Sequence, residues 1–255
     1  MIFFDKPSNA YPSARPPSAL ERVSGAGPLV QFLCLGGLAL PAVAALIWAT
    51  TGGHSGVATG LGVTVFLIAV SLAAFDLRRS FPHAVLGWCN AVTLFRAGLV
   101  SGLVAMLAVP SPEPWTVIAI ATLAFTLDGL DGWLARREGL SSPFGARFDV
   151  EVDSALALFL TLHAWLWGGV GAWVLLFGLP RYAFAAAQWV YPWLDGPLPE
   201  RFTRKLVCVA QIAVLIAILL PFVGPAAANA LLGLIAAALI WSFTLDIRHL
   251  RRSRG

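Results

Sequence analysis

The chain has 255 residues, of which 58% are hydrophobic and only 12% are charged, and its formal net charge is +4. A soluble domain carries about 25% charged residues, so the composition excludes an ordinary soluble protein and indicates a polytopic membrane protein. The basic residues lie between apolar segments, which favours topology signals and contacts with anionic headgroups and argues against nucleic-acid binding. The three widely spaced cysteines form no CxxC pair, which argues against a disulfide framework or a zinc site.

Apolar segments of membrane-spanning length follow a polar N-terminal stretch. Residues 1–27 are rich in Pro, Ser and charge and are expected to form a disordered cytoplasmic tail. A helix needs about 20 residues to cross the hydrocarbon core. The segments predict an all-α protein with eight transmembrane helices, at about 28–49, 57–76, 86–109, 115–136, 144–167, 171–191, 206–222 and 226–245.

Among the connectors between predicted spans, only alternate ones contain Lys or Arg. These basic residues precede the first predicted span, follow every even-numbered one, and are missing from the connectors between. This alternation predicts that both termini and the connectors at that face are cytoplasmic, in a protein of the cell (inner) membrane. The residues concerned are Arg15, Arg22, Arg78, Arg79, Arg136, Arg137, Arg147, Arg201, Arg204, Lys205, Arg248, Arg251, Arg252 and Arg254.

Four aspartates lie where the fourth and fifth predicted spans meet the cytoplasmic face. Asp128 and Asp131 fall on one side of a helix, and Asp149 and Asp153 are one helical turn apart on the next. Two antiparallel helices would bring the four carboxylates together, where repulsion and desolvation are costly unless cations intervene. An all-carboxylate site suits Mg²⁺ or Mn²⁺. The alternative is a structural ion-pair network with the available partners Arg136, Arg137 and Arg147.

The spacing of these residues resembles a known family signature. The pattern Asp128-x2-Asp131-Gly132-x2-Ala135-Arg136-x8-Gly145-x3-Asp149-x3-Asp153 matches that of the CDP-alcohol phosphatidyltransferases at every defined position. The upstream Asn90-x2-Thr93-x2-Arg96 resembles part of the first core helix of that family. The resemblance covers about residues 86–245 and implies a six-helix core.

The expected organisation follows from this resemblance. Two additional transmembrane helices (28–79) would precede a catalytic core (80–247), and a basic cytoplasmic C-terminus (248–255) would follow it. The family is commonly homodimeric, so a homodimer is expected. The resemblance implies that the substrates are CDP-diacylglycerol or a related CDP-lipid and a small alcohol acceptor, among membrane lipids.

The resemblance also implies roles for the site residues. Asp128, Asp131 and Asp149 would hold the metal, while Asp153 would lie beside it and act as general base. Nucleotide-binding residues are expected from the motif and from the segments beside it. These are Asn90, Thr93, Gly132, Arg136, Ser142 and Gly145.

Two intramembrane arginines have open interpretations. Arg181 is expected to face a polar cavity and bind a phosphate of the acceptor or lipid, or else to pair with an internal aspartate. Arg96, with Asn90 and Thr93, could provide interhelical hydrogen bonds, or it could snorkel to the interface.

The implied reaction is transfer of a phosphatidyl-type group from a CDP-alcohol to an alcohol, with release of CMP, in phospholipid biosynthesis. The alternatives are an ion or proton transporter that uses the carboxylate cluster, and a non-catalytic scaffold for lipid synthesis. A transporter would favour carboxylates near the bilayer midplane, whereas these lie at a span end beside arginines.

Overall fold

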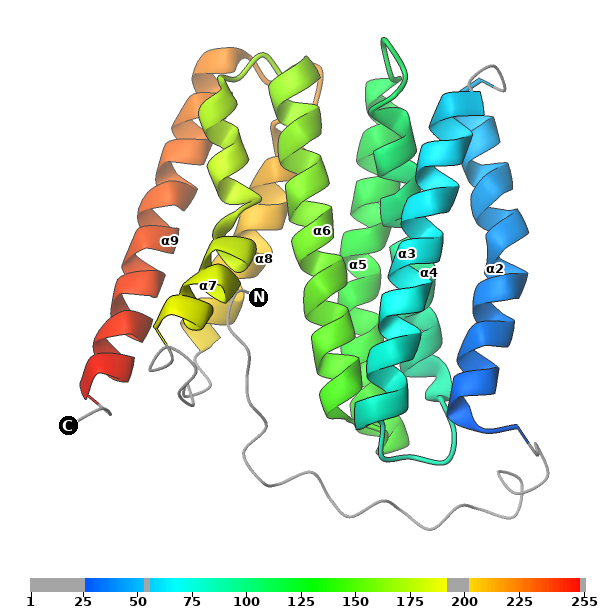
Figure 1. Cartoon of the computed structure of the whole chain (residues 1–255). Coiled ribbons are helices and arrows are strands. Elements are labelled where there is room, and N and C mark those ends of the chain that lie inside the picture. The colour runs from blue at the N-terminus through cyan, green and yellow to red at the C-terminus, as the bar shows by residue number, and fades with distance from the viewer. Residues whose placement is uncertain (1–25, 53–55, 192–201, 253–255) are drawn as a thin grey trace. The chain divides into compact units, whose positions relative to one another are not determined.

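The computed structural model describes residues 26–52, 56–191 and 202–252, and all regular structure in these ranges is helical (Figure 1). The tail expected at 1–27 lies outside the described residues apart from its last two positions. The elements are α2 (Pro28–Thr50), α3 (Gly56–Ser80), α4 (Gly87–Met106), α5 (Pro114–Glu138), α6 (Pro143–Trp167), the 3₁₀ helix η1 (Ala172–Phe177), α7 (Pro180–Val190), α8 (Phe202–Ala217) and α9 (Pro225–Arg252).

Six helices among the described residues are long and apolar enough to cross a membrane. They are α2, α3, α4, α5, α6 and α9. The chain is therefore a multi-pass membrane protein, as its composition predicts. Six of the eight expected spans correspond to these helices.

The two remaining predicted spans are shorter or broken. Residues 171–191, expected as one helix, form η1 and then α7, so that expectation is wrong. A Cβ added at Gly178 would lie 2.7 Å from Leu158 Cα of α6, so the backbone passes directly against that helix. Pro180 then begins α7, because proline lacks an amide hydrogen and suits a first helical turn. The span predicted at 206–222 begins earlier, as α8, and ends in turns after Ala217.

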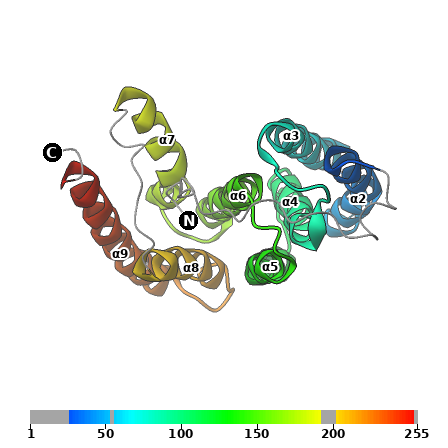
Figure 2. The ribbon, with the colours of Figure 1, turned by 90° about the horizontal axis from the view of Figure 1, so that it is seen from below.

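The described residues divide into two compact units, with the boundary inside α6 between Val152 and Asp153. In the N-terminal unit, α4 lies in the middle and contacts α2, α3 and α5 (Figure 2). Small residues allow the close approach of α3 to α4. A Cβ added at Gly62 would lie 2.9 Å from the Ser101 carbonyl oxygen. Most side chains of α4 are consequently buried.

A short turn joins α5 to α6 in the same unit. Gly139 ends α5 in the left-handed conformation, with φ 65°, which glycine adopts without a steric penalty. Ser142 precedes α6, and its hydroxyl accepts a hydrogen bond from the Gly145 amide at 3.0 Å, as an N-terminal cap does. The turn therefore returns the chain so that the end of α5 and the start of α6 lie near each other.

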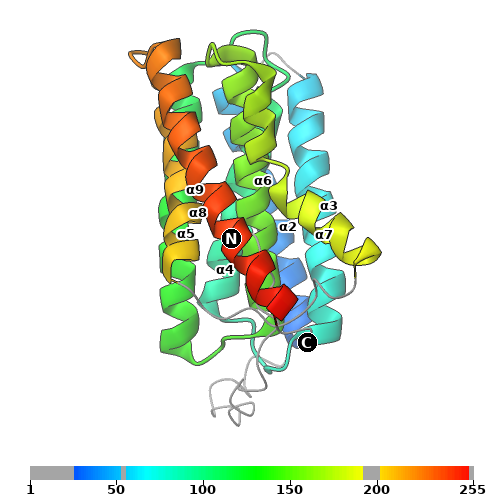
Figure 3. The ribbon, with the colours of Figure 1, turned by 90° about the vertical axis from the view of Figure 1, so that its left-hand side faces the viewer.

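The C-terminal unit contains the rest of α6 with η1, α7, α8 and α9. Helices α8 and α9 pack against each other and diverge away from the loop that joins them (Figure 3). The buried Gln211 side chain of α8 donates a hydrogen bond to the Phe177 carbonyl at 2.7 Å. This bond ties α8 to the break between η1 and α7.

Candidate active site

The central feature of the N-terminal unit is Arg96, a fully buried arginine on α4. Its guanidinium lies 3.2 Å from Asp128 Oδ1, 2.7 Å from Asp131 Oδ2 and 2.6 Å from Asp149 Oδ1. Its Nε donates a hydrogen bond to the Ala124 carbonyl at 3.0 Å. One side chain from α4 therefore contacts carboxylates of both α5 and α6.

The three carboxylates form a compact group. Asp128, Asp131 and Asp149 each offer an oxygen, and these oxygens all lie within 4.8 Å of one another. Asp131 is the most buried of the three, and its Oδ2 also lies 3.0 Å from the Thr93 hydroxyl. Three negative charges and the one positive charge of Arg96 leave a formal charge of −2.

This donor set fits a divalent cation. All the ligand atoms are carboxylate oxygens, which hard cations such as Mg²⁺ and Mn²⁺ prefer. A charge of −2 is balanced by one such ion, while half-buried carboxylates without a counter-ion would be costly. The residues present are therefore compatible with the metal site expected from the sequence.

Three of the expected nucleotide-binding residues lie together, one helical turn from the carboxylates. A Cβ added at Gly145 would lie 3.2 Å from Ser142 Oγ and 3.3 Å from Asn90 Oδ1. Asn90 is one turn before Thr93 on α4, and Gly145 is one turn before Asp149 on α6. A glycine at this point lets the α6 backbone approach two polar side chains closely, next to the three carboxylates.

Gly132 and Arg136 lie one turn apart at the end of α5. The Arg136 side chain is exposed and folds back over the glycine, because a Cβ added at Gly132 would lie 3.5 Å from Arg136 Nη1. This exposed guanidinium has a planar fork of donors that suits a phosphate.

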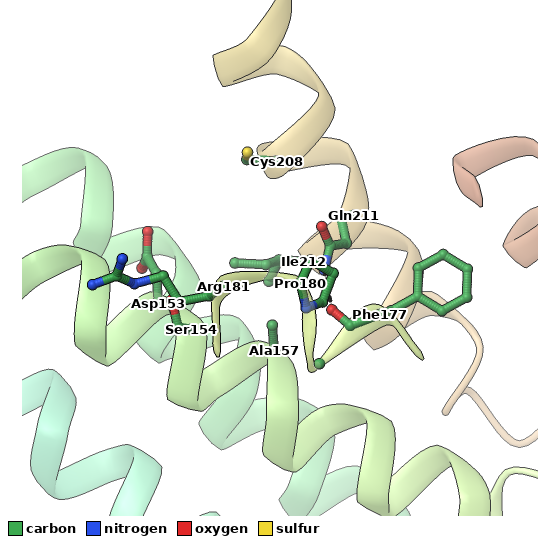
Figure 4. Close-up of a pocket in the computed structure, with 10 residues that line it drawn as sticks. Asp153, Ser154, Ala157, Phe177, Pro180, Arg181, Cys208, Gln211 and Ile212 are labelled. Atoms are coloured by element: carbon green, nitrogen blue, oxygen red, sulfur yellow. Dashed lines mark hydrogen bonds between the residues drawn. The ribbon is translucent and has the colours of Figure 1, made fainter. Parts of the chain in front are cut away.

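The C-terminal unit holds the two remaining predicted residues in one pocket, shown in Figure 4. Asp153 is buried and lies one turn beyond Asp149 on α6, and Arg181 is buried on α7. The Arg181 side chain lies alongside Asp153 and Ser154 (Figure 4). The pocket is lined by Asp153, Ser154, Ala157, Phe177, Gly178, Pro180, Arg181, Cys208, Gln211 and Ile212.

Comparison with known proteins places these residues within a family. Residues 86–244 match the family model described as CDP-alcohol phosphatidyltransferase. The chain belongs to the CDP-alcohol phosphatidyltransferase family. The resemblance expected from the aspartate spacing is thus confirmed, over almost the range predicted, and it supports a membrane transferase of phospholipid biosynthesis.

A curated relative is much longer than the matched region. Cholinephosphotransferase 1 of Rattus norvegicus is 28% identical over 175 residues, which are 64% of this chain and 40% of that protein. The chain therefore covers less than half the length of this relative. No solved structure matches the chain.

Sequence reasoning left the role of Arg96 open between interhelical contact and snorkelling. In the structure Arg96 is buried among the aspartates, so snorkelling to the interface is wrong. The arginines that the sequence offered as ion-pair partners lie elsewhere: Arg147 pairs with Asp76, and Arg137 lies over the Trp133 ring. A charged residue inside an apolar span is the signal that could have identified Arg96, because such residues usually face internal partners.

The carboxylate group predicts a metal-binding defect in Asp131→Asn. Loss of outer-shell partners alone lowers metal affinity by about 10–100-fold, so loss of a buried charged oxygen should weaken Mn²⁺ binding at least about tenfold. Binding is measured on purified protein from the electron paramagnetic resonance signal of free Mn²⁺.

Glu151→Gln is the matched control. Glu151 is an exposed carboxylate two residues from Asp149 on α6, and its removal changes the charge equally. Its Mn²⁺ affinity should stay near that of the native protein. Equal affinities of Asp131→Asn and the native protein would contradict a metal site at these three aspartates.

Proposed function

We propose that this protein transfers a phosphatidyl-type group from CDP-diacylglycerol or a related CDP-alcohol to an alcohol acceptor and releases CMP. The observation that carries the proposal is the group of Asp128, Asp131 and Asp149 around Arg96. These aspartates belong to the spacing pattern that resembles the family signature. The family model also matches residues 86–244, which contain them.

In this proposal the three aspartates hold Mg²⁺ or Mn²⁺, and Asp153 on the next turn of α6 is a further ligand. The bound cation would neutralise pyrophosphate charge and stabilise the departing phosphate. Thr93 orients Asp131 through its hydroxyl, which lies 3.0 Å from the carboxylate oxygen. A buried polar partner of this kind fixes the direction in which a ligand oxygen points.

The nucleotide is proposed to lie along the polar residues beside the metal-binding group. Gly145 brings the α6 backbone close to Asn90 and Ser142. The cytidine or its phosphate would contact these two polar side chains. Arg136 would pair with a phosphate oxygen above Gly132. The acyl chains or other apolar parts of the lipid would remain among the membrane-spanning helices.

The pocket of the C-terminal unit is proposed to receive the acceptor alcohol. It combines a buried cation, a carboxylate and an amide: Arg181, Asp153 and Gln211. The guanidinium suits an anionic or oxygen-rich group. Gln211 is held by its bond to Phe177, which gives the pocket a defined wall.

The proposed chemistry is a direct displacement at phosphorus. The acceptor oxygen forms a bond to the phosphorus on the alcohol side of the CDP-alcohol, and the bond from that phosphorus to the bridging oxygen breaks. CMP leaves with the bridging oxygen and the bonding electron pair. The hydroxyl proton passes to the Asp153 carboxylate, as in general base catalysis.

The test is CMP release from purified protein with a panel of CDP-alcohols and acceptors. CDP-diacylglycerol is tested with small alcohols, and the name of the rat relative adds CDP-choline with a lipid alcohol. CMP release should require Mn²⁺ or Mg²⁺ and should stop in EDTA. It should occur with one combination of CDP-alcohol and acceptor and not with the others. Absence of metal-dependent CMP release for every pair would contradict the proposal.

We further propose that the site faces the cytoplasm and that the protein is a homodimer, as expected from the arginine distribution and the family. A cysteine replacing Arg137 should react with an impermeant reagent only from the cytoplasmic side. Reaction from the outer side would show that the proposed orientation in the membrane is wrong. Detergent-purified protein should form cross-linked dimers. Recovery of monomers only after cross-linking would exclude the homodimer.

Asp153→Asn tests the general base. The variant should keep Mn²⁺ binding through the three remaining aspartates, and it should still bind the CDP-alcohol. Its turnover should fall at least about a hundredfold, since a positioned base contributes about 10²–10⁴-fold. Binding and turnover are measured on the same preparation, with Glu151→Gln as the control. If binding falls in parallel with turnover, Asp153 acts mainly as a ligand. If turnover is unchanged, no base is needed there.

A further inference from the structure

Helices α2 and α3 lie outside the family match, which begins at residue 86. They nevertheless contact the matched region closely, because both pack against α4. Their contacts with the first half of α6 are more specific. This half of α6 carries Gly145 and the proposed metal ligand Asp149.

The apolar contact centres on Phe32 of α2, whose side chain is fully buried. Its ring meets those of Phe144 and Phe148 edge-on, with centroids 6.1 Å and 5.9 Å away. Phe144 also contacts Phe81, which follows α3, at 5.8 Å. Because the α6 residues are one turn apart, this cluster holds one side of α6 against the two preceding helices.

The polar contact is a two-point ion pair between α6 and α3. Arg147 donates from Nε to Asp76 Oδ2 at 3.0 Å and from Nη2 to Asp76 Oδ1 at 2.8 Å. The same Nη2 donates to the Ser80 hydroxyl, which lies one turn further along α3. A fork of this kind restricts both distance and orientation, unlike a single ion contact.

These contacts restrain the rotation of α6 about its own axis. Arg147 is two residues before Asp149, so the two side chains leave the helix on roughly opposite sides. One side of α6 is held by Asp76 and Phe32, and the other presents Asp149 to Arg96 at 2.6 Å. A small rotation would move the Asp149 carboxylate away from Asp128 and Asp131.

We propose that Asp76 and Arg147 are positioning residues for Asp149, and that the two N-terminal helices serve to set the geometry of the metal site. The inference rests on the proposed function, because it assumes that the three aspartates bind a divalent cation. Neither residue contacts the cation in this account. Functional groups must be held within about 0.5 Å of productive geometry, which is why a restraint on α6 affects affinity.

The decisive variant is Arg147→Gln, because two explanations predict opposite signs. Removing a positive charge near three carboxylates would strengthen Mn²⁺ binding if only long-range electrostatics mattered. Loss of positioning should instead weaken it, by about tenfold, as loss of outer-shell partners does. Mn²⁺ affinity is measured in the absence of substrate by electron paramagnetic resonance. Tighter or unchanged binding would overturn the inference.

Asp76→Asn and the double variant Asp76→Arg with Arg147→Asp complete the set. Asp76→Asn should weaken Mn²⁺ binding by a similar factor, and the exchanged pair should recover most of the lost affinity. Arg78→Gln is the matched control, since Arg78 is exposed in the last turn of α3, and it should bind Mn²⁺ like the native protein. Weak binding by the exchanged pair, equal to that of both single variants, would count against a specific pairing.

Two further comparisons separate the possible failures. If Arg147→Gln cannot be purified folded, Arg147→Lys keeps the charge without the fork and should show intermediate Mn²⁺ affinity, whereas native affinity would contradict the inference. If Asp131→Asn binds Mn²⁺ like the native protein, the proposed metal site itself is wrong. If Asp131→Asn loses binding and Arg147→Gln does not, only the positioning role fails.

Discussion

The arrangement of the N-terminal unit depends on one buried cation and the carboxylates that surround it. Burial of an arginine is expensive unless its charge is paired and its hydrogen-bond donors are used. Arg96 meets this requirement with Asp131, Asp149 and Asp128 and with the backbone of α5. Since these partners come from two helices, α4, α5 and α6 can pack in few relative registers.

The turn between α5 and α6 and a contact between α5 and α4 hold the carboxylates around Arg96. The α5–α6 turn, closed by Gly139 and by the Ser142 cap, returns the chain so that Asp149 reaches the same guanidinium as the α5 aspartates. Glu138, the last residue of α5, also contacts the start of α4: its carboxylate accepts hydrogen bonds from the Trp88 and Cys89 amides. Helices α4, α5 and α6 are therefore joined by Arg96 and also by these contacts close to it.

The sequence was informative where chemistry depends on spacing within one helix. The intervals Asp128–Asp131 and Asp149–Asp153 predicted that each pair lies on one face of its helix, because residues three or four apart share a helical face. They also carried the family resemblance. The same local reasoning predicted six of the membrane spans, since length and hydropathy decide that property.

Sequence reasoning failed where the outcome depends on contacts between distant helices. The partners of Arg96 lie 28–53 residues away, so its spacing on α4 could not distinguish internal pairing from snorkelling. The Arg147 pair with Asp76 joins positions 71 residues apart. The break between η1 and α7 falls at Gly178, which lies directly against α6, and hydropathy alone does not register such packing.

In the proposed site, Arg96 supplies part of the positive charge that the three aspartates need, and a divalent cation supplies the rest. Thermal unfolding of Arg96→Gln, with EDTA and with Mn²⁺, tests this division of charge. Removing one partner of a buried ion pair costs about 3–5 kcal/mol, so the variant should unfold at a much lower temperature than the native protein in EDTA. Mn²⁺ should then raise the unfolding temperature of the variant more than that of the native protein. Equal responses of the two proteins to Mn²⁺ would contradict charge sharing between Arg96 and the cation.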